Sequence, residues 1–241
     1  LQRPEAMNAV TTALASVLKE TVRAAGDDPE VRVVVIRGAG GNFCAGGDFD
    51  EVQRLRAEGR DALRTLFTSF RGACAAIGEI GQPVIAAVEG VAMAGGFELM
   101  QAADIALVSE EARISDNHVN FGMVPGGGGS QRLPRLVGRQ RAIGILLSGD
   151  RLSGLDAVEA GLAYRAFPTA AFQEEVAAFA TKLAGRHPDA VRRIKQLVRD
   201  GLATHLDAGL DLELDAVVSH ITGDAGDASV SAFADRKDEK S

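Results

Sequence analysis

The sequence has few of the aromatic and clustered basic residues that form nucleic-acid binding sites. It contains no tryptophan, one tyrosine and ten phenylalanines scattered along 241 residues, so there is little material for a platform on which bases could stack. The formal net charge is -7, whereas a protein that binds duplex nucleic acid needs clustered lysine and arginine to displace counterions. We therefore expect no nucleic-acid partner.

Cysteines and long apolar runs are also scarce. Cys44 and Cys74 lack the paired spacing of a zinc site, and two cysteines do not indicate a disulfide framework, so we expect reduced thiols and no metal site. No segment approaches the ~20 apolar residues of a membrane-spanning helix, and no charged segment precedes an apolar one as in a secretion signal. We expect a cytoplasmic protein without a membrane partner.

The remaining composition is that of a folded globular protein, with 46% hydrophobic and 24% charged residues. Runs rich in β-branched residues predict strands at 31–36, 84–91, 104–108 and 164–167. Three- and four-residue apolar spacings predict helices at 4–25, 49–80, 97–103, 139–147, 153–161, 170–184 and 188–202, with one more ending near Gly138. This layout predicts an α/β fold with one main domain and a helical C-terminal region.

Two glycine-containing turns, residues 44–48 and 93–98, each follow an apolar strand. Glycine lets a backbone approach a ligand closely, and if the second turn opens a helix, its unpaired amides attract a developing oxyanion. Glu98 follows within an apolar stretch, where burial would raise its pKa towards the range useful for proton transfer. The alternative is that the glycines only form tight turns and Glu98 lies on the surface.

Five motifs resemble the enoyl-CoA hydratase/isomerase, or crotonase, family. They lie at residues 3–9 (RPEAMNA), 43–48 (FCAGGD), 83–88 (PVIAAV), 95–99 (GGFEL) and 128–134 (GGSQRLP). Their order and spacing match from end to end, and residues 232–237 resemble the closing motif of the family. Family members usually begin with a further β-hairpin, which we expect to precede Leu1.

The resemblance implies a spiral of repeated β-β-α turns over residues 1–185 and a C-terminal helical region over 186–241 that forms trimers, commonly a dimer of trimers. It implies an acyl-CoA thioester as substrate, with coenzyme A as part of that substrate and no prosthetic group. By similarity the amides of Gly47 and Gly95 form an oxyanion hole for the thioester oxygen. Motif position assigns coenzyme A contacts to the backbone of Ala6, Ala45, Gly46, Gly47, Asp48 and Gly95.

The chain departs from the hydratase pattern at its second glutamate. Hydratases of the family resemble one another in a Gln-Pro-Glu motif, which here reads Asp116-Asn117-His118. Imidazole titrates near ~6.5 and can accept or donate a proton, so His118 is a candidate second acid/base or a hydrogen-bonding pocket residue, and Asp116 could orient it. Where other members place an aspartate, this chain has Pro125 and Gly126, neither of which supplies an acid.

Three functions therefore remain open. The first is an enoyl-CoA hydratase in which Glu98 and His118 divide the proton transfers. The second is an enoyl-CoA isomerase that uses Glu98 alone, and the third is a non-catalytic acyl-CoA binder.

Three further sequence features could have a functional role, but in each case we favour a purely structural explanation. Residues 126–129 could form an anion-binding nest, but turn flexibility before a helix is the simpler interpretation. Arg236 and Lys237 could reach a phosphate of coenzyme A, but a solvated charged tail is the simpler interpretation. Cys44 could be a nucleophile but lacks an evident base.

Overall fold

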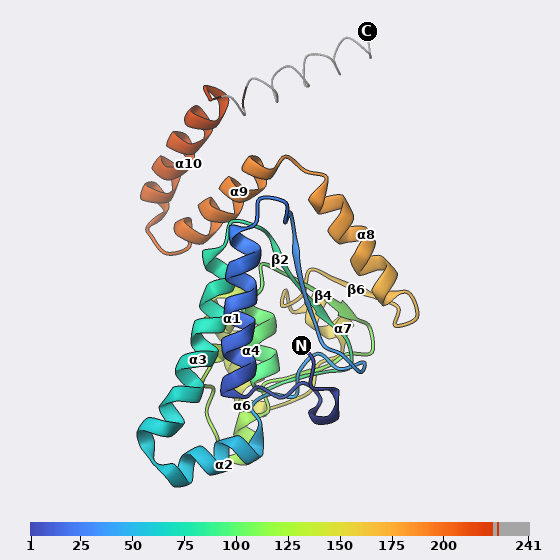
Figure 1. Cartoon of the computed structure of the whole chain (residues 1–241). Helices are drawn as coiled ribbons and strands as arrows, with labels where there is room; N and C mark the ends of the chain where they lie inside the picture. Colours follow the sequence, from blue (N-terminus) through green and yellow to red (C-terminus); the bar gives the residue numbers. More distant parts are fainter. Residues whose placement is uncertain (224–225, 227–241) are drawn as a thin grey trace. The chain divides into compact units, whose positions relative to one another are not determined.

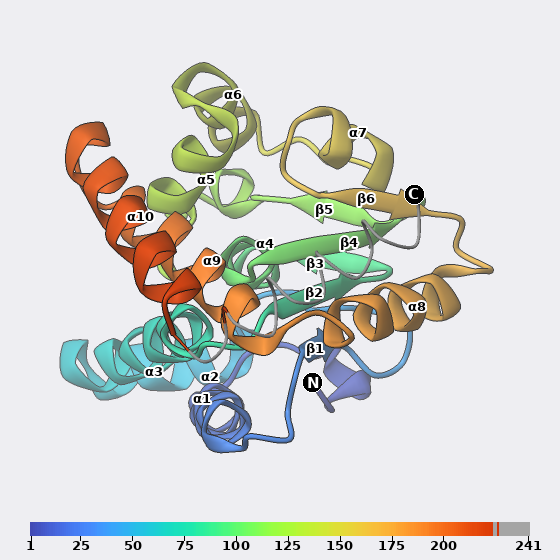
Figure 2. The same cartoon turned by 90° about the horizontal axis from the view of Figure 1, so that it is seen from above.

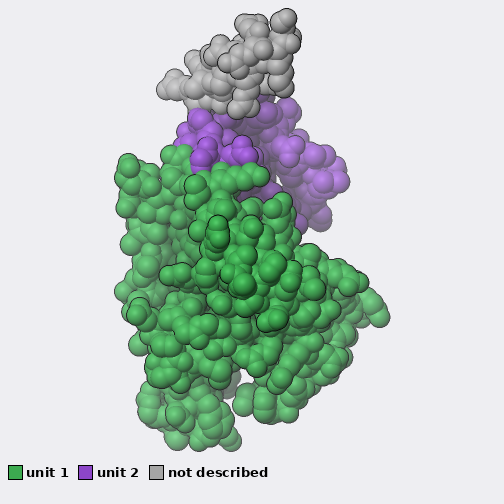
Figure 3. Space-filling view, turned by 90° about the vertical axis from the view of Figure 1, so that its right-hand side faces the viewer, with its two compact units in different colours: residues 1–184 green, residues 185–241 purple. Residues whose placement is uncertain are grey.

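The computed structural model describes residues 1–223 and 226, and the chain divides into two compact units, Leu1–Ala184 and Gly185–Ser241 (Figure 3). The first unit contains two parallel sheets. The larger has the strand order β1 (Val34–Arg37), β2 (Val84–Val88), β4 (Ile105–Ser109), β6 (Arg165–Phe167), and the smaller pairs β3 (Val91–Met93) with β5 (Arg113–Ser115).

The chain repeats one pattern along these sheets: a strand in the larger sheet, a pairing in the smaller sheet, then a helix. β2 and β3 lead into α4 (Gly95–Ala102), while β4 and β5 lead into a 3₁₀ turn, η2 (His118–Phe121), and α5 (Gly129–Val137). After β1, Cys44 bridges to Ala92 in the smaller sheet before α2 (Phe49–Glu58) and α3 (Arg60–Glu79). This is a spiral of β-β-α turns.

Helices cover the rest of the first unit. α1 (Thr12–Asp27) begins where the hydroxyl of Thr11 accepts a hydrogen bond from the amide of Leu14, and it lies beside α3 (Figure 1). The remaining helices follow in chain order: α6 (Arg139–Ser148), α7 (Gly154–Glu159) and α8 (Phe172–Ala184).

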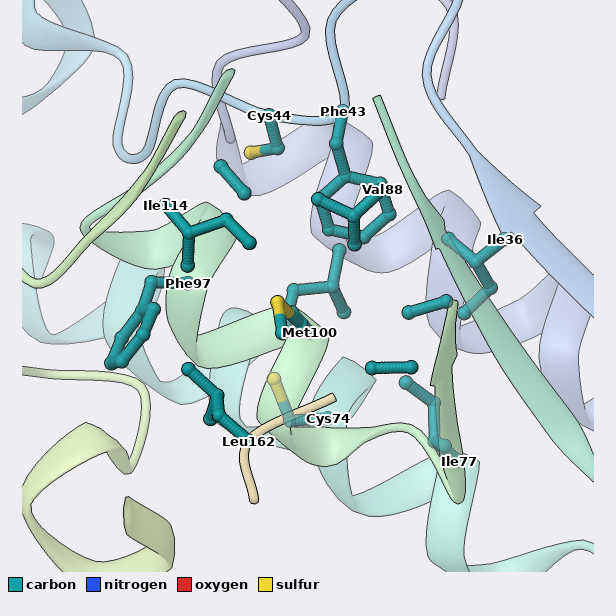
Figure 4. Close-up of a cluster of buried hydrophobic side chains, with 14 of the residues drawn as sticks. Ile36, Phe43, Cys44, Cys74, Ile77, Val88, Phe97, Met100, Ile114 and Leu162 are labelled. Atoms are coloured by element: carbon teal, nitrogen blue, oxygen red, sulfur yellow. The ribbon is translucent and has the colours of Figure 1, made fainter. Parts of the chain in front are cut away.

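Both faces of the larger sheet are buried, which explains the continuous apolar run of β2. On one face, Ile85, Ala87 and Leu107 pack with Phe172 and Val176 of α8 (Figure 2). On the other face lies the main core, in which the side chains of Phe43, Val88 and Met100 gather with both cysteines (Figure 4).

Several predicted elements were wrong in extent. The predicted helix 4–25 is a 3₁₀ turn, η1 (Pro4–Ala6), followed by α1, because Met7 and Asn8 adopt positive φ angles of 46° and 57°. The predicted helix 49–80 is divided at Gly59, and the predicted strand 84–91 at Gly90, where φ is +117° and +61°. Among the described residues, three elements were missed: β5, η2 and α10 (Leu206–Ile221).

The second unit, as far as it is described, consists of α9 (Pro188–Gly201) and α10, which pack against each other. Both helices expose large apolar side chains, including Ile194, Val198, Leu206 and Leu214. No helix within residues 1–223 has the length and apolar character needed to cross a membrane.

Candidate active site

The first glycine turn is held against the N-terminal segment. The amide of Val10 donates to the carbonyl of Gly46 (2.7 Å), and the amide of Asp48 donates to the carbonyl of Val10 (2.9 Å). These two bonds flank Gly47 and use the neighbouring peptide groups, so its own amide is directed away from this pairing. Gly46 has φ +110° and closely approaches Ala94, and both features require glycine.

The second glycine turn joins β3 to α4 through Ala94, whose φ of 47° is rare for alanine. Its amide donates to the carbonyl of Ser115, and its carbonyl accepts from the amide of Glu98 (both 3.0 Å), so the strained residue is fixed on both sides. α4 then begins at Gly95, two residues before the predicted start, so the second turn does open a helix whose first amides lack partners within the helix.

The two turns are in contact. A Cβ atom on Gly95 would lie 3.5 Å from the amide nitrogen of Gly47 and 3.4 Å from the Cα of Gly46. Within residues 1–223 and 226, the amides of Gly47 and Gly95 donate no hydrogen bond to another protein group. Two free amides therefore lie close together beside α4.

Glu98 is buried, with 2% of its surface exposed. Its Oε1 accepts hydrogen bonds from the amides of Gly127 (2.7 Å) and Gly129 (2.8 Å). Burial raises the pKa of Glu98, while the hydrogen bond from Gly129, the charge of His118 and the bond from Gly127 oppose that rise in part. The burial and the raised pKa expected from the sequence are both confirmed.

Two amides of the glycine run 126–129 thus hold the protein's own carboxyl group, that of Glu98. Arg132 braces this loop by donating from Nη1 to the carbonyl of Gly127 (2.6 Å). A Cβ atom on Gly127 would lie 2.2 Å from the ring of Phe70 and 2.8 Å from Oε2 of Glu98. The turn before a helix that we favoured is present, since α5 begins at Gly129 directly after Gly128 with φ +117°, and two amides of the loop also donate hydrogen bonds to Glu98.

His118 contacts Asp116 directly. The distance from Nδ1 of His118 to Oδ1 of Asp116 is 2.6 Å, and the two side chains are 14% and 1% exposed. Burial lowers the pKa of His118, but the hydrogen bond and charge of Asp116, together with the charge of Glu98, outweigh it, so the pKa of His118 is raised. The orientation that Asp116 could provide is thus present as a short contact.

These groups share one cavity of about 290 Å³. Gly47, Gly95, Glu98 and His118 all line it. Its other walls are mainly apolar side chains from α2, α3 and the segment around η2, including Phe49, Val52, Leu66, Phe67, Phe70, Phe121, Met123 and Val124. Sequence reasoning identified the polar members but could not name these walls.

The residues assigned to coenzyme A lie close together. The amide of Ala45 donates to the carbonyl of Met7, which places the segment around Ala6 beside the first glycine turn. The side chain of Asp48 caps α2 by accepting from the amide of Glu51 (3.0 Å) and forms an ion pair with Arg3 (2.9 Å). Its carboxylate therefore has a structural role, and its backbone amide and carbonyl are engaged by Val10 and Val52.

Two weaker signals have different outcomes. Cys44 is fully buried, and burial raises the pKa of its thiol to about 11, which disfavours a reactive thiolate. Arg236, Lys237 and the rest of the motif at 232–237 lie outside the described residues. Among the described residues, no group of three or more histidine, cysteine, aspartate or glutamate side chains could hold a metal ion.

A family model for enoyl-CoA hydratase/isomerase matches residues 1–240. The chain belongs to this family. It is 35% identical over 213 residues to the 2,3-dehydroadipyl-CoA hydratase of Escherichia coli K12, covering 88% of this chain and 82% of that protein. It is 32% identical over 237 residues to the mitochondrial enoyl-CoA hydratase of Pongo abelii, covering 98% and 80%.

Solved structures of the hydratase/isomerase family have the same fold. An enoyl-CoA hydratase from Polaromonas sp. JS666 superposes with a TM-score of 0.93 at 31% identity, over 97% of this chain and 91% of that one. The crotonase-type fold expected from the motifs is therefore confirmed. The chain is an acyl-CoA enzyme of the hydratase/isomerase family, whose members act on coenzyme A thioesters.

Proposed function

We propose that this enzyme hydrates 2-enoyl-CoA thioesters to 3-hydroxyacyl-CoA thioesters. The observation that supports this most is a single cavity that presents two free amides together with two different proton carriers, Glu98 and His118. The thioester oxygen lies between the amides of Gly47 and Gly95. As water adds to C3, the C2–C3 electrons move towards that oxygen, and the two donors stabilise the resulting enolate.

Glu98 and His118 divide the proton transfers according to their charges. Glu98 acts as a carboxylate and accepts the proton of the attacking water through Oε2, since both hydrogen bonds from the described residues go to Oε1. His118 acts as an imidazolium and donates a proton to C2 through Nε2, since Nδ1 is engaged by Asp116. Exchange of one proton with solvent then restores both groups.

The decisive experiment measures the loss of conjugated enoyl-thioester absorbance with crotonyl-CoA. We expect turnover by the wild-type chain, and a fall in kcat of about 10²- to 10⁴-fold for Glu98→Gln and for His118→Gln, since each removes a positioned proton carrier. Equal turnover by the wild type and Glu98→Gln would contradict the proposal.

An isomerase is the second candidate, because Glu98 alone can carry one proton between C2 and C4, and because a histidine replaces the second carboxylate of the hydratases. The same variants separate the two functions when a 3-enoyl-CoA is supplied. If His118→Gln retains full isomerisation and the wild type does not hydrate crotonyl-CoA, the isomerase is the better assignment. Binding of acyl-CoA without turnover of any thioester would favour a non-catalytic role.

We also infer that the chain self-associates, as a trimer or a dimer of trimers, through its helical C-terminal unit. The support is the amount of apolar surface that α9 and α10 leave exposed: Ile194, Val198, Leu206 and Leu214 are each more than half exposed. Large apolar side chains that several neighbouring turns leave exposed are typical of protein contact sites.

A further inference from the structure

The turn between β5 and η2 places a buried carboxylate behind the histidine of the cavity. Ser115 ends β5, Asp116 follows with 1% of its surface exposed, and His118 begins η2. Oδ1 of Asp116 accepts from the ring Nδ1 of His118 at 2.6 Å and from its backbone amide at 3.4 Å. The short ring contact fixes the imidazole relative to its own backbone.

We propose that Asp116 is a positioning residue of the reaction: it holds His118 by Nδ1, so that Nε2 is the nitrogen presented to the substrate, and its charge stabilises the imidazolium. This inference rests on the proposed function and adds a residue to it. A carboxylate in place of His118 would present two equivalent oxygens, whereas an imidazole has two distinct nitrogens, and the bond made by one determines the role of the other.

The surroundings of Asp116 strengthen its tie to His118. Its other oxygen, Oδ2, is buried and has no hydrogen-bond partner among the described residues. It lies beside Gly129, where a Cβ atom would be 3.0 Å from Oδ2 and 3.3 Å from Oε1 of Glu98. A buried carboxylate with one unpaired oxygen is costly, so the contact with His118 is the interaction that compensates its charge.

Among the described residues, Asp116 and Glu98 are the charged groups that act on the pKa of His118, and both are acidic. Each favours the protonated ring, and together they outweigh the effect of burial on the pKa of His118. An imidazolium stabilised by the charges of both carboxylates is the state from which His118 can donate a proton to C2. The pair Asp116 and His118 would thus perform the work of the second glutamate of the hydratases, with a cationic acid in place of a neutral one.

The test uses Asp116→Asn, which keeps the shape of the side chain and removes its charge. In the wild type, ¹⁵N spectra of histidine-labelled protein should show neutral His118 protonated on Nδ1 and not on Nε2. In the variant the pKa of His118 should fall by about one unit or more. The alkaline limb of kcat should move to lower pH by a similar amount, and kcat should fall about 10- to 100-fold with little change in KM.

Two controls separate positioning from general structural damage. Asp156→Asn makes the same chemical change in the capping box of α7, away from the cavity, and should leave both kcat and the titration of His118 unchanged. In a His118→Gln background, Asp116→Asn should have little further effect on kcat, because it acts through the ring that is already absent.

Three results would overturn the inference. The first is a pKa of His118 that is the same in the wild type and in Asp116→Asn. The second is a loss of kcat on Asp116→Asn that is as large in the His118→Gln background as in the wild type. If Asp116→Asn does not fold, the wild-type spectrum decides, and a neutral ring protonated on Nε2 rejects the proposal. Failure of the proposed function is measured separately, as absence of crotonyl-CoA hydration by the wild type, because the spectra need no turnover.

Discussion

At residues 127 and 129 a side chain has no room, because the backbone there lies between Glu98 and neighbouring groups. A Cβ on Gly127 would meet the ring of Phe70 and Oε2 of Glu98, and one on Gly129 would meet Oδ2 of Asp116. The absence of side chains lets two amides reach the same carboxylate oxygen, which partly offsets the cost of its burial.

Gly127→Ala should therefore lower kcat, by about 10- to 100-fold, since it displaces an amide that orients Glu98. Gly144→Ala is the matched control: Gly144 lies within α6 with open space around its Cβ position, so it should leave kcat unchanged and stabilise the helix by up to ~1 kcal/mol. Steady-state hydration kinetics and thermal unfolding measure both effects. A Gly127→Ala variant as active as Gly144→Ala would show that the loop does not position Glu98.

The pH dependence of kcat follows from the two raised pKa values. Glu98 must be a carboxylate, so activity is lost as the pH falls through its raised pKa, and the acid limb should lie above the ordinary value of 4.5. His118 must be an imidazolium, so activity is lost as the pH rises through its raised pKa, and the alkaline limb should lie above 6.5. A bell-shaped profile displaced to higher pH on both sides is expected, and its apparent pKa values belong to the coupled pair.

His118→Gln should remove the alkaline limb, because the imidazolium that titrates there is then absent. A limb that persists unchanged in His118→Gln would instead assign that titration to another group.

Some features of the site's residues could be predicted from the sequence, and others could not. The burial of Glu98 was predicted because its neighbours Phe97, Leu99 and Met100 are apolar, and periodicity reports burial directly. The donors Gly127 and Gly129 lie about thirty residues further along the chain, and no local pattern states which acid a distant loop will bind. The glycine run itself was the available signal.

At the scale of elements, the points at which a predicted helix and a predicted strand are interrupted depend on the backbone conformation of single residues. Apolar spacing continues through Gly59 and Gly90, so a pattern of hydrophobicity extends the helix 49–80 and the strand 84–91 across both residues. Their positive φ angles end α2 and β2, and such angles are a consequence of tertiary packing that composition only permits. β5 was missed because three residues are too few to show an alternation.

The elements that wall the cavity predict a preference for acyl chains longer than four carbons. α2, α3 and η2 expose Phe49, Phe67 and Phe121 by 61%, 41% and 70%, all at the same cavity. Each additional buried methylene contributes about 0.8 kcal/mol, so kcat/KM should rise by up to about fourfold per methylene from crotonyl-CoA to 2-octenoyl-CoA.

Phe121→Ala should reduce this dependence on chain length, because it removes part of the wall. Leu155→Ala is the control, since Leu155 is 57% exposed on α7 and does not line the cavity. Hydration rates measured for a series of 2-enoyl-CoA thioesters decide the matter. A flat series in the wild type would show that these side chains do not contact the acyl group.

At the scale of the whole molecule, the sequence was most informative. Five motifs spread over residues 3–134 lie in the segment around η1, the two glycine turns, the strand β2 and the start of α5, and the fold brings the last four around one cavity and its neighbouring core. Contacts between residues this distant in the sequence could be predicted from the family resemblance, but not from the propensities of local segments. The structure of a single chain indicates how several chains assemble only through the apolar surface that it leaves exposed.

That surface gives the last prediction. Ile194 and Val198 lie one turn apart on α9 and are 61% and 60% exposed, so replacing both with aspartate would bury two charges in any contact made there. The wild type should sediment with a mass of three or six times the 25.1 kDa of one chain, and the double variant with a smaller mass. Gln196→Asp, an exposed polar position on the same helix, should leave the mass unchanged, whereas a monomeric wild type would contradict self-association through this unit.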